Sequence, residues 1–446
     1  MRPLEAIAGF ASLCALAVWL APESGRVWLR ALGLLTASIL LAHVVWEGWR
    51  WQAAPIYLSA LALTFANAYP RICSSASAVL GLGGFTLCYA IPVFALPAPT
   101  GPYAIGARTM YLSDPDREEK HGGGPRNFVV EVWYPAEAGA EGGRAIYRDP
   151  GALLARSYHH RLVQTHAIKE AKALGRQAGW PIVFFSPSSG GYRTQNSFLC
   201  EDLASHGYVV VGVDHPYSSS RVVMQDGKVI HSLPSDWLQI ATQESWRASQ
   251  PIVESTLETR AADVLYAWKA LEAQGSLPID FRRAAAIGHS FGGAVAAELC
   301  RRDARFLTGA NFDGWMFEKV KENGVAPNFL FAIEDDPLWA RNEGPYPNDY
   351  DGNARLGTRE YHDTIRRSLR RHGGYLWRPA KAGHGDFSDL ALYLRWPFPG
   401  QARGNEARVR HLHDETREIV LALLNKHLKG QDSPKLEQFA HAKEGS

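Results

Sequence analysis

The stretch Gly288-His289-Ser290-Phe291-Gly292 decides the fold that this sequence predicts, because it places a serine between a strand and a helix. The preceding residues, Arg283–Ile287, are mostly small and apolar and predict a short buried strand. The following residues, Gly293–Cys300, predict a helix. A Gly-x-Ser-x-Gly turn in this setting is typical of a nucleophile elbow, in which glycines permit a sharp turn and the serine hydroxyl is exposed. Ser290 is therefore the predicted nucleophile.

Apolar runs alternate with helical stretches on both sides of this elbow. The expected strands are Ala107–Leu112, Phe128–Tyr134, Pro181–Ser186, Tyr208–Asp214, Arg283–Ile287, Phe306–Phe312, Asn328–Ile333 and Tyr375–Pro379. The expected helices are Thr194–His206, Ile252–Gln274, Phe291–Arg301, Glu360–Arg371 and Asp414–Leu428. Strands followed by helices predict an α/β protein with a mostly parallel, doubly wound sheet, the α/β-hydrolase fold.

The first hundred residues differ in composition from the rest, since they hold only eight of the 92 charged side chains. Each of their four apolar stretches is about long enough to span a bilayer as a helix, a length of roughly 17–25 residues. The stretches are Leu4–Ala21, Val27–Trp46, Ala53–Tyr69 and Ile72–Leu96. We predict a bundle of about four transmembrane helices over residues 1–98, a catalytic domain over 99–430 and a polar, loose tail over 431–446. The alternatives are a cleaved signal peptide for the first stretch and buried soluble helices for the whole block.

Charge and cysteine content narrow the possible location and partners. An even number of spans places both the N-terminus and the catalytic domain on one side, with two loop arginines there against three on the other. Positive-inside counting then favours an extracytoplasmic catalytic domain on a multi-pass protein of a bacterial cell membrane. The net charge of +2 comes without a basic cluster, so nucleic acid is not an expected partner. The five cysteines predict neither a metal site nor a disulfide framework.

A nucleophilic serine needs a histidine base and an acid that orients it. His384 follows the last expected strand and lies between two glycines, in the place where this fold carries its base. The acid has two candidate positions. Asp313 ends one strand, whereas Asp335 and Asp336 follow the next strand, which the usual layout of the fold favours slightly.

Most of residues 101–425 resembles the platelet-activating-factor acetylhydrolase family of plasma, type II intracellular and bacterial enzymes. Phe312-Asp-Gly-Trp-Met-Phe317, just after the elbow, is the most specific matching piece. The resemblance implies that the acid is Asp313, and it matches the family's His-x-x-Phe-x-Asp segment to His384 through Asp389. The other matching pieces are Thr100–Gly106, Val132–Pro135, Asp202–Val210 and Gly288–Ala294.

The loop after the strand Pro181–Ser186 departs from the family. The family has Ser-His-Gly followed by an oxyanion-hole donor, whereas this chain has Ser186-Pro-Ser-Ser-Gly-Gly191. The resemblance assigns the two oxyanion donors to the backbone N–H groups of Ser189 and Phe291. Pro187 lacks an N–H and fixes its φ, so the shape of this hole is expected to differ from the family's.

The resemblance implies a serine esterase that removes short acyl chains from phospholipids without calcium, and no metal or organic cofactor is expected. The alternatives are a broad carboxylesterase or acyltransferase acting on other esters, and an inert hydrolase domain with a binding or signalling role. The segment Pro150–Leu174 is expected to be a helix, either an interfacial or lid helix or an ordinary surface helix. The sequence does not predict an oligomeric state.

Overall fold

The computed structural model describes residues 2–20, 28–66, 68–233, 243–325, 328–335, 350–395 and 406–442. Its contacts divide the chain into two units. The first contains Met1–Ala95 together with Leu153–Gln164 and Leu392–Glu406, and the second contains the remainder. The predicted boundary near residue 98 falls close to this division, but the sequence did not predict the two later segments of the first unit.

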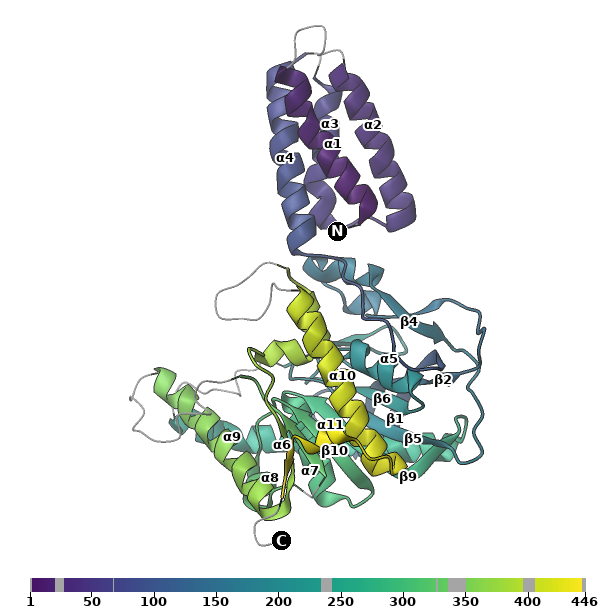
Figure 1. Cartoon of the computed structure of the whole chain (residues 1–446), viewed down its shortest axis with the longest axis vertical. Coiled ribbons are helices and arrows are strands. Elements are labelled where there is room, and N and C mark those ends of the chain that lie inside the picture. Colours follow the sequence, from purple (N-terminus) through teal and green to yellow (C-terminus); the bar gives the residue numbers. More distant parts are fainter. Residues whose placement is uncertain are drawn as a thin grey trace. The chain divides into compact units, whose positions relative to one another are not determined.

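A mostly parallel sheet, eleven-stranded in the described part of the chain, forms the centre of the second unit (Figure 1). The order is β13-β12-β11-β10-β9-β5-β6-β2-β1-β4-β3, in which β6, β5, β9, β10, β11 and β12 are parallel neighbours and β2 is antiparallel to both β1 and β6. This order confirms the predicted α/β-hydrolase-like sheet. The strands are β1 (Ala104–Glu118), β2 (Pro125–Ala136), β3 (Arg144–Ile146), β4 (Gln164–Lys169), β5 (Trp180–Ser186), β6 (Val209–Asp214), β9 (Ile279–His289), β10 (Phe306–Phe312), β11 (Phe329–Ala332), β12 (Gly374–Trp377) and β13 (Ala440–His441), and β7 (Arg221–Val223) and β8 (Val229–His231) form a separate hairpin.

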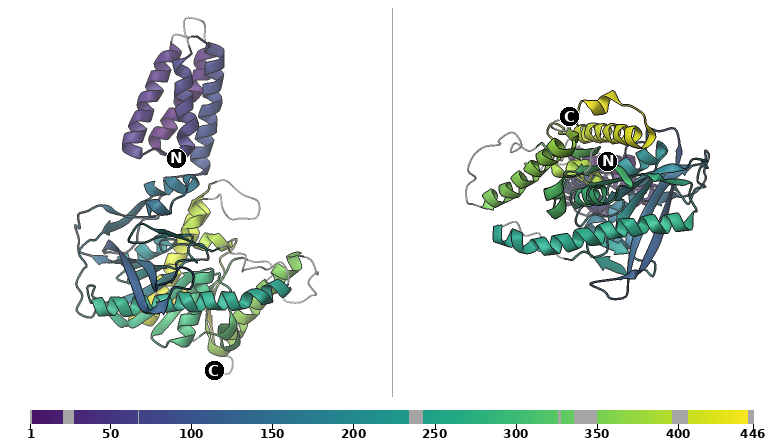
Figure 2. Two further views of the ribbon diagram at one scale, coloured as in Figure 1. Left: turned by 180° about the vertical axis from the view of Figure 1, so that it is seen from behind. Right: turned by 90° about the horizontal axis from the view of Figure 1, so that it is seen from below.

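Helices cover both faces of the sheet, so its central strands are buried throughout. Every residue of β5 and β6 is buried, and alternate side chains point to opposite faces. Ile182 and Phe184 of β5 pack into the core that α6, α7, α8 and α9 share. Figure 2 shows α6 and α10 on opposite sides of the sheet. The helices of this unit are α5 (Ser197–Ser205), α6 (Gln243–Gln274), α7 (Phe291–Arg302), α8 (Glu318–Asn323), α9 (Tyr350–His372), α10 (Glu406–Lys429) and α11 (Pro434–Glu437).

The apolar stretches of the first unit form four helices: α1 (Pro3–Leu20), α2 (Trp28–Ala42), α3 (Ala54–Thr64) and α4 (Pro70–Ala90). A π-helical turn, His43–Glu47, extends α2. Among the described residues, only α4 is long and apolar enough by itself to cross a membrane. The expected helices are therefore present, although α3 has only 11 residues and α4 ends before the predicted Leu96.

A buried ionic group joins the helices of this unit. The Arg50 guanidinium donates two hydrogen bonds of 2.6 Å to the Glu5 carboxylate, and His43 Nε2 lies 3.1 Å from the same carboxylate. All three side chains are fully buried. The ion pair between Arg50 and Glu5 therefore links α1 to the chain that follows the π-helical turn.

Two expectations were wrong. The segment Pro150–Leu174 is not a helix: it forms short 3₁₀ turns at Pro150–Ala152 and Ala155–Leu162, followed by strand β4. The C-terminal tail is not loose through His441, because it contains α11 and β13, and β13 pairs with β12 at the sheet edge. Polar composition did not reveal this pairing, since an edge strand is held by its backbone rather than by apolar side chains.

Candidate active site

The elbow lies where β9 ends and α7 begins. Ser290 has φ 56° and ψ −125°, a strained conformation for a residue other than glycine. Its N–H donates to the Phe312 carbonyl at 2.8 Å, which holds the turn against β10. A Cβ on Gly292 would lie 1.9 Å from the Ser186 carbonyl oxygen, so only glycine lets α7 approach β5 this closely.

The structure brings the three predicted side chains into one chain of hydrogen bonds. His384 Nδ1 lies 2.6 Å from Asp313 Oδ2, and His384 Nε2 lies 3.1 Å from Ser290 Oγ. The Asp313 side chain is 5% exposed, whereas that of His384 is 49% exposed. The acid is thus shielded from water, while the histidine and the serine can be reached from solvent.

Strand register explains why Asp313 and Ser290 meet. In the parallel pair β9–β10, Phe312 lies opposite His289, so the next residue of each strand emerges at the same edge of the sheet. Asp313 is fixed there by its N–H, which donates to the Ala332 carbonyl at 2.7 Å. Its second oxygen, Oδ1, accepts the Glu334 N–H at 3.1 Å.

Asp335, the other candidate acid, binds the backbone of the loop that carries His384. Its carboxylate accepts the Lys381 N–H at 2.7 Å, and its own N–H donates to the Ala382 carbonyl at 2.8 Å. These bonds tie the end of β11 to the loop that carries His384. Asp336 lies outside the described residues.

The His-x-x-Phe-x-Asp segment docks the histidine loop onto α5. Asp389 is fully buried, and its carboxylate accepts the N–H groups of Ser197 and Phe198 at the start of that helix. Burial raises the pKa of Asp389 well above its usual value. Asn196 adds a 2.7 Å hydrogen bond to the Phe387 carbonyl. Phe387 and Asp389 therefore position the loop, whereas His384, the first residue of the motif, is the candidate base.

A second histidine, His289, is buried and links the two loops that border the serine. His289 Nε2 donates to the His384 carbonyl at 2.8 Å, and its Nδ1 accepts from Gln195 Nε2 at 2.7 Å. The Gln195 Oε1 atom in turn accepts the Ser188 N–H at 3.2 Å. Burial, with a smaller contribution from His384, lowers the pKa of His289 to about 3, so this ring is neutral at pH 7. Neither Gln195 nor His289 was predicted from the sequence, although His289 lies inside the elbow motif.

Three of the four backbone N–H groups in the loop after β5 are engaged in hydrogen bonds. The N–H groups of Ser188, Gly190 and Gly191 donate to Gln195 Oε1, the Ser218 carbonyl and the Ser188 carbonyl, respectively. Within the described residues, Ser189 has the remaining loop N–H for which the structure gives no acceptor. Phe291, which carries the other predicted donor, is the first residue of α7, where helix geometry favours negative charge.

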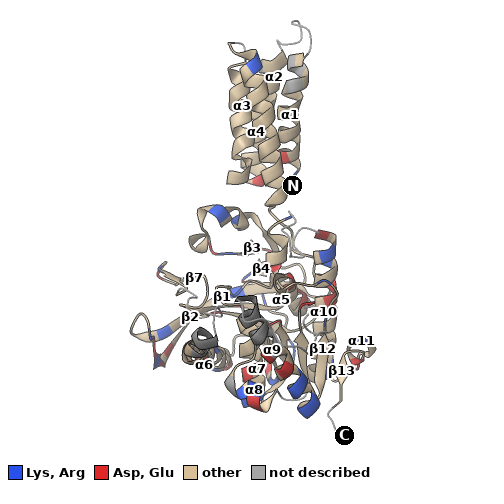
Figure 3. Cartoon of the chain, turned by 90° about the vertical axis from the view of Figure 1, so that its left-hand side faces the viewer, with Lys and Arg blue, Asp and Glu red and all other residues tan. Residues whose placement is uncertain are grey.

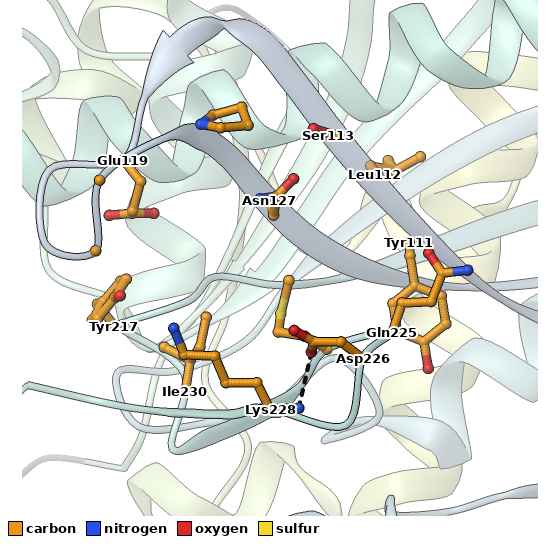
Figure 4. A pocket seen from close by; sticks show the side chains of 14 residues that line it. Tyr111, Leu112, Ser113, Glu119, Asn127, Tyr217, Gln225, Asp226, Lys228 and Ile230 are labelled. Carbon is orange, nitrogen blue, oxygen red and sulfur yellow. Dashed lines mark hydrogen bonds between the residues drawn. The ribbon is translucent and has the colours of Figure 1, made fainter.

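Two cavities in this unit lie beside the β1–β2 hairpin. One, of about 330 Å³, lies between that hairpin and β7–β8 and is lined by Tyr111, Tyr217 and Lys228 among others (Figure 4). The other, of about 600 Å³, lies along the first half of α6. Neither is lined by Ser290, Asp313 or His384, so we do not assign either to the reacting ester.

The sheet order, the elbow and the serine–histidine–aspartate geometry define the class as α/β-hydrolase. The chain belongs to the platelet-activating factor acetylhydrolase, isoform II, family, whose family model matches residues 96–335. Comparison with known proteins thus agrees with the resemblance carried by the motifs.

Named relatives support an ester hydrolase. Platelet-activating factor acetylhydrolase of Bos taurus is 30% identical over 178 residues, which cover 35% of this chain and 40% of that protein. The enzyme of the same name from Gallus gallus is 26% identical over 318 residues, covering 60% and 71%. A solved ferulic acid esterase from Streptomyces cinnamoneus has a TM-score of 0.60 and 26% identity, covering 78% of this chain and 96% of that one. The chain therefore matches less than half the length of the bovine relative.

Proposed function

We propose that this protein is a serine ester hydrolase that works through an acyl-enzyme on Ser290. The observation that supports this most is the continuous hydrogen-bond chain from Asp313 through His384 to Ser290, with links of 2.6 and 3.1 Å. A serine, a base and a buried acid in this order are the parts that acyl transfer requires.

In the proposed mechanism, His384 Nε2 takes the proton of Ser290 as its Oγ attacks the ester carbonyl. The Asp313 carboxylate accepts the Nδ1–H and stabilises the imidazolium that forms. The N–H groups of Phe291 and Ser189 bind the developing oxyanion. His384 then gives its proton to the leaving alcohol, and water repeats the sequence on the acyl-enzyme. The reaction as proposed uses only water and the protein's own groups.

The proposed substrate is an amphiphilic ester with a short acyl chain, such as a phospholipid with an sn-2 acetyl group. Family membership supports this choice, as does a fungal relative, from Arthroderma benhamiae, named a probable 1-alkyl-2-acetylglycerophosphocholine esterase. The second candidate is a broad carboxylesterase or acyltransferase. It is supported by the likeness to a ferulic acid esterase and by the changed loop at Pro187 and Ser188.

We also propose that residues 1–98 anchor the enzyme in a membrane through α1–α4. Of the 26 large apolar side chains that are exposed in the described residues, 19 precede residue 90. Such a surface on a helical unit is costly in water and suited to lipid. Figure 3 shows these helices almost free of charged residues, unlike the second unit. The catalytic unit is proposed to lie on the extracytoplasmic side, from the loop arginine count.

The function is tested with detergent-purified protein on 2-acetyl and 2-palmitoyl phospholipids of the same headgroup, with Ser290→Ala as the matched inactive control. Release of acetate faster than palmitate, lost in the variant, is the expected result. Turnover of p-nitrophenyl acetate with neither lipid cleaved would favour the broad esterase. No turnover of any ester would refute the proposal.

The anchor is tested by washing membranes that contain the full chain with alkaline carbonate. An anchored protein stays in the pellet and is released only by detergent, because burial of the four apolar helices does not depend on charge. Release by carbonate alone would refute the anchor without touching the esterase proposal.

A further inference from the structure

Arg260, on α6, is a fully buried cation next to the loop that follows β5. Its guanidinium donates to the Pro187 carbonyl at 2.7 Å and to the Ser188 carbonyl at 3.2 Å. Nη2 and Nε also donate to Ser218 Oγ, at 2.6 and 2.9 Å. Among the described residues, no carboxylate lies within ion-pair distance of it.

Burying an arginine without a paired carboxylate costs free energy, because the guanidinium loses much of its hydration. A contribution to stability therefore does not explain why Arg260 is buried. Burial lowers the pKa of Arg260 to about 9, and the charges that face it are those of Asp263, Arg126 and Asp214. The group is still protonated at pH 7. A full positive charge is thus held beside the predicted oxyanion hole.

The contacts of Arg260 with the loop fix the direction of the Ser189 N–H. In a trans peptide the C=O and the N–H point in opposite directions. Because the Ser188 carbonyl is directed to Arg260 Nη2 and to the Gly191 N–H, the Ser189 N–H of the same peptide is directed away from Arg260. A flip of this peptide would break both bonds, so the arginine fixes one predicted oxyanion donor.

The same guanidinium contacts the residue that carries the other donor. Its central carbon lies 4.8 Å from the centre of the Phe291 ring, within the range of a cation–π interaction. One side chain therefore touches both Phe291 and the peptide before Ser189, although Arg260 lies 72 residues from Ser188 in sequence.

We propose that Arg260 is the positioning residue of the oxyanion hole: it aims the Ser189 N–H, braces Phe291 and adds a buried positive charge to the field at the oxyanion. This inference rests on the proposed esterase function. Arg260 is not placed against the reacting ester: it is fully buried, and the cavity of about 600 Å³ that it helps to line contains none of Ser290, Asp313 and His384.

The test compares Arg260→Met with wild type on p-nitrophenyl acetate. Loss of one oxyanion donor typically lowers kcat by about 100- to 1,000-fold, so loosening one without deleting it should lower kcat by about 10- to 100-fold. KM should stay within about threefold, because these bonds strengthen only in the transition state. Arg260→Lys should recover part of the loss by restoring charge without the fork that binds two carbonyls.

A pair of inhibitors separates positioning from general damage. An alkyl trifluoromethyl ketone adds to Ser290 Oγ, its carbonyl oxygen becomes an oxyanion, and the serine proton passes to His384. The matching methyl ketone is expected to bind without addition. Arg260→Met should weaken the trifluoromethyl ketone by the same factor as kcat and leave the methyl ketone unchanged. A merely structural defect would weaken both.

Arg305→Met is the matched control. Arg305 also stacks on an aromatic residue, with its guanidinium 4.5 Å from the Trp268 ring, but it touches neither loop of the site. It should retain wild-type kcat. If Arg260→Met does not fold, Ser218→Ala takes its place. That variant removes the Oγ that holds Arg260 and keeps the carbonyl that binds the Gly190 N–H.

The inference would be overturned if wild type hydrolysed the ester and Arg260→Met had the same kcat. It would also be overturned if the folded variant kept the wild-type ratio of affinities for the trifluoromethyl and methyl ketones. In both cases the esterase proposal would stand. Where Ser218→Ala is used, it is judged by the same ratio. A wild-type protein that hydrolyses no ester would instead refute the proposed function.

Discussion

Replacing Asp313 by Asn should nearly abolish turnover without disturbing the fold. The Asp313 Oδ1 atom accepts the Glu334 N–H, so the amide oxygen of Asn should keep that place and turn its NH₂ group toward His384. An NH₂ group donates, which forces His384 Nδ1 to accept and moves the ring proton to Nε2. Nε2 then has no lone pair for the Ser290 proton.

The expected magnitude follows from losing both the base and the charged 2.6 Å hydrogen bond. We expect kcat/KM to fall by about 1,000- to 10,000-fold, equivalent to about 4–5.5 kcal/mol of transition-state stabilisation. The assay is hydrolysis of p-nitrophenyl acetate by detergent-purified protein, with the thermal unfolding midpoint measured alongside.

Asp335→Asn is the matched control, since an Asn oxygen can still accept the Lys381 N–H that Asp335 binds at 2.7 Å. Its activity should stay within about threefold of wild type, as for most partly exposed substitutions. The reasoning would be refuted if Asp313→Asn kept a substantial share of activity while Asp335→Asn lost it.

Gly292→Ala should lose most of the activity or most of the folded protein, because the new Cβ would lie 1.9 Å from the Ser186 carbonyl oxygen. Gly143→Ala is the control, since nothing lies within 4 Å of its Cβ, and it should behave as wild type in the same melting and turnover assays. Gln195→Leu should lower the unfolding free energy by about 1–3 kcal/mol for each buried group left unpaired, and kcat should fall with it; an unchanged denaturant midpoint would contradict this. Burial lowers the pKa of His413 to about 4, so below pH 6.5 the unfolded chain binds a proton that the folded chain refuses. Stability should therefore fall on acidification from pH 7 to 5, by about 2 kcal/mol for this residue, and a His413→Gln variant whose melting midpoint falls as steeply would refute the assignment.

The strands and helices of the catalytic unit could be predicted because each has a strong local signal. Val209–Val211 and Phe184–Phe185 are continuous apolar runs that only a strand covered on both faces can bury. The segment around Ala155–Leu162 lacked such a signal. Its His, Arg and Leu residues are compatible with a helix, but Gln52 Nε2 lies 3.0 Å from His159 Nδ1, a contact with a residue 107 positions earlier that no local pattern contains.

The local sequence pattern could not identify the acid of the site. Sequence spacing admitted both Asp313 and Asp335, and only the motif resemblance separated them. The structure adds the physical ground, which is the register of β9 against β10 together with the bonds that commit Asp335 to the histidine loop.

The sequence by itself predicted the elbow with its serine, the place of the candidate base His384 and the contrast between an apolar N-terminal block and a charged remainder. These features are encoded by residues that are near neighbours in the chain, where glycine sterics and hydrophobic periodicity act directly. Only the tertiary structure decided the supporting network of Gln195, His289 and Arg260. The bonds Gln195–His289, Arg260–Ser188 and His289–His384 join residues 72 to 95 positions apart. Such a bond depends on where the fold brings two atoms, which the local sequence does not reveal.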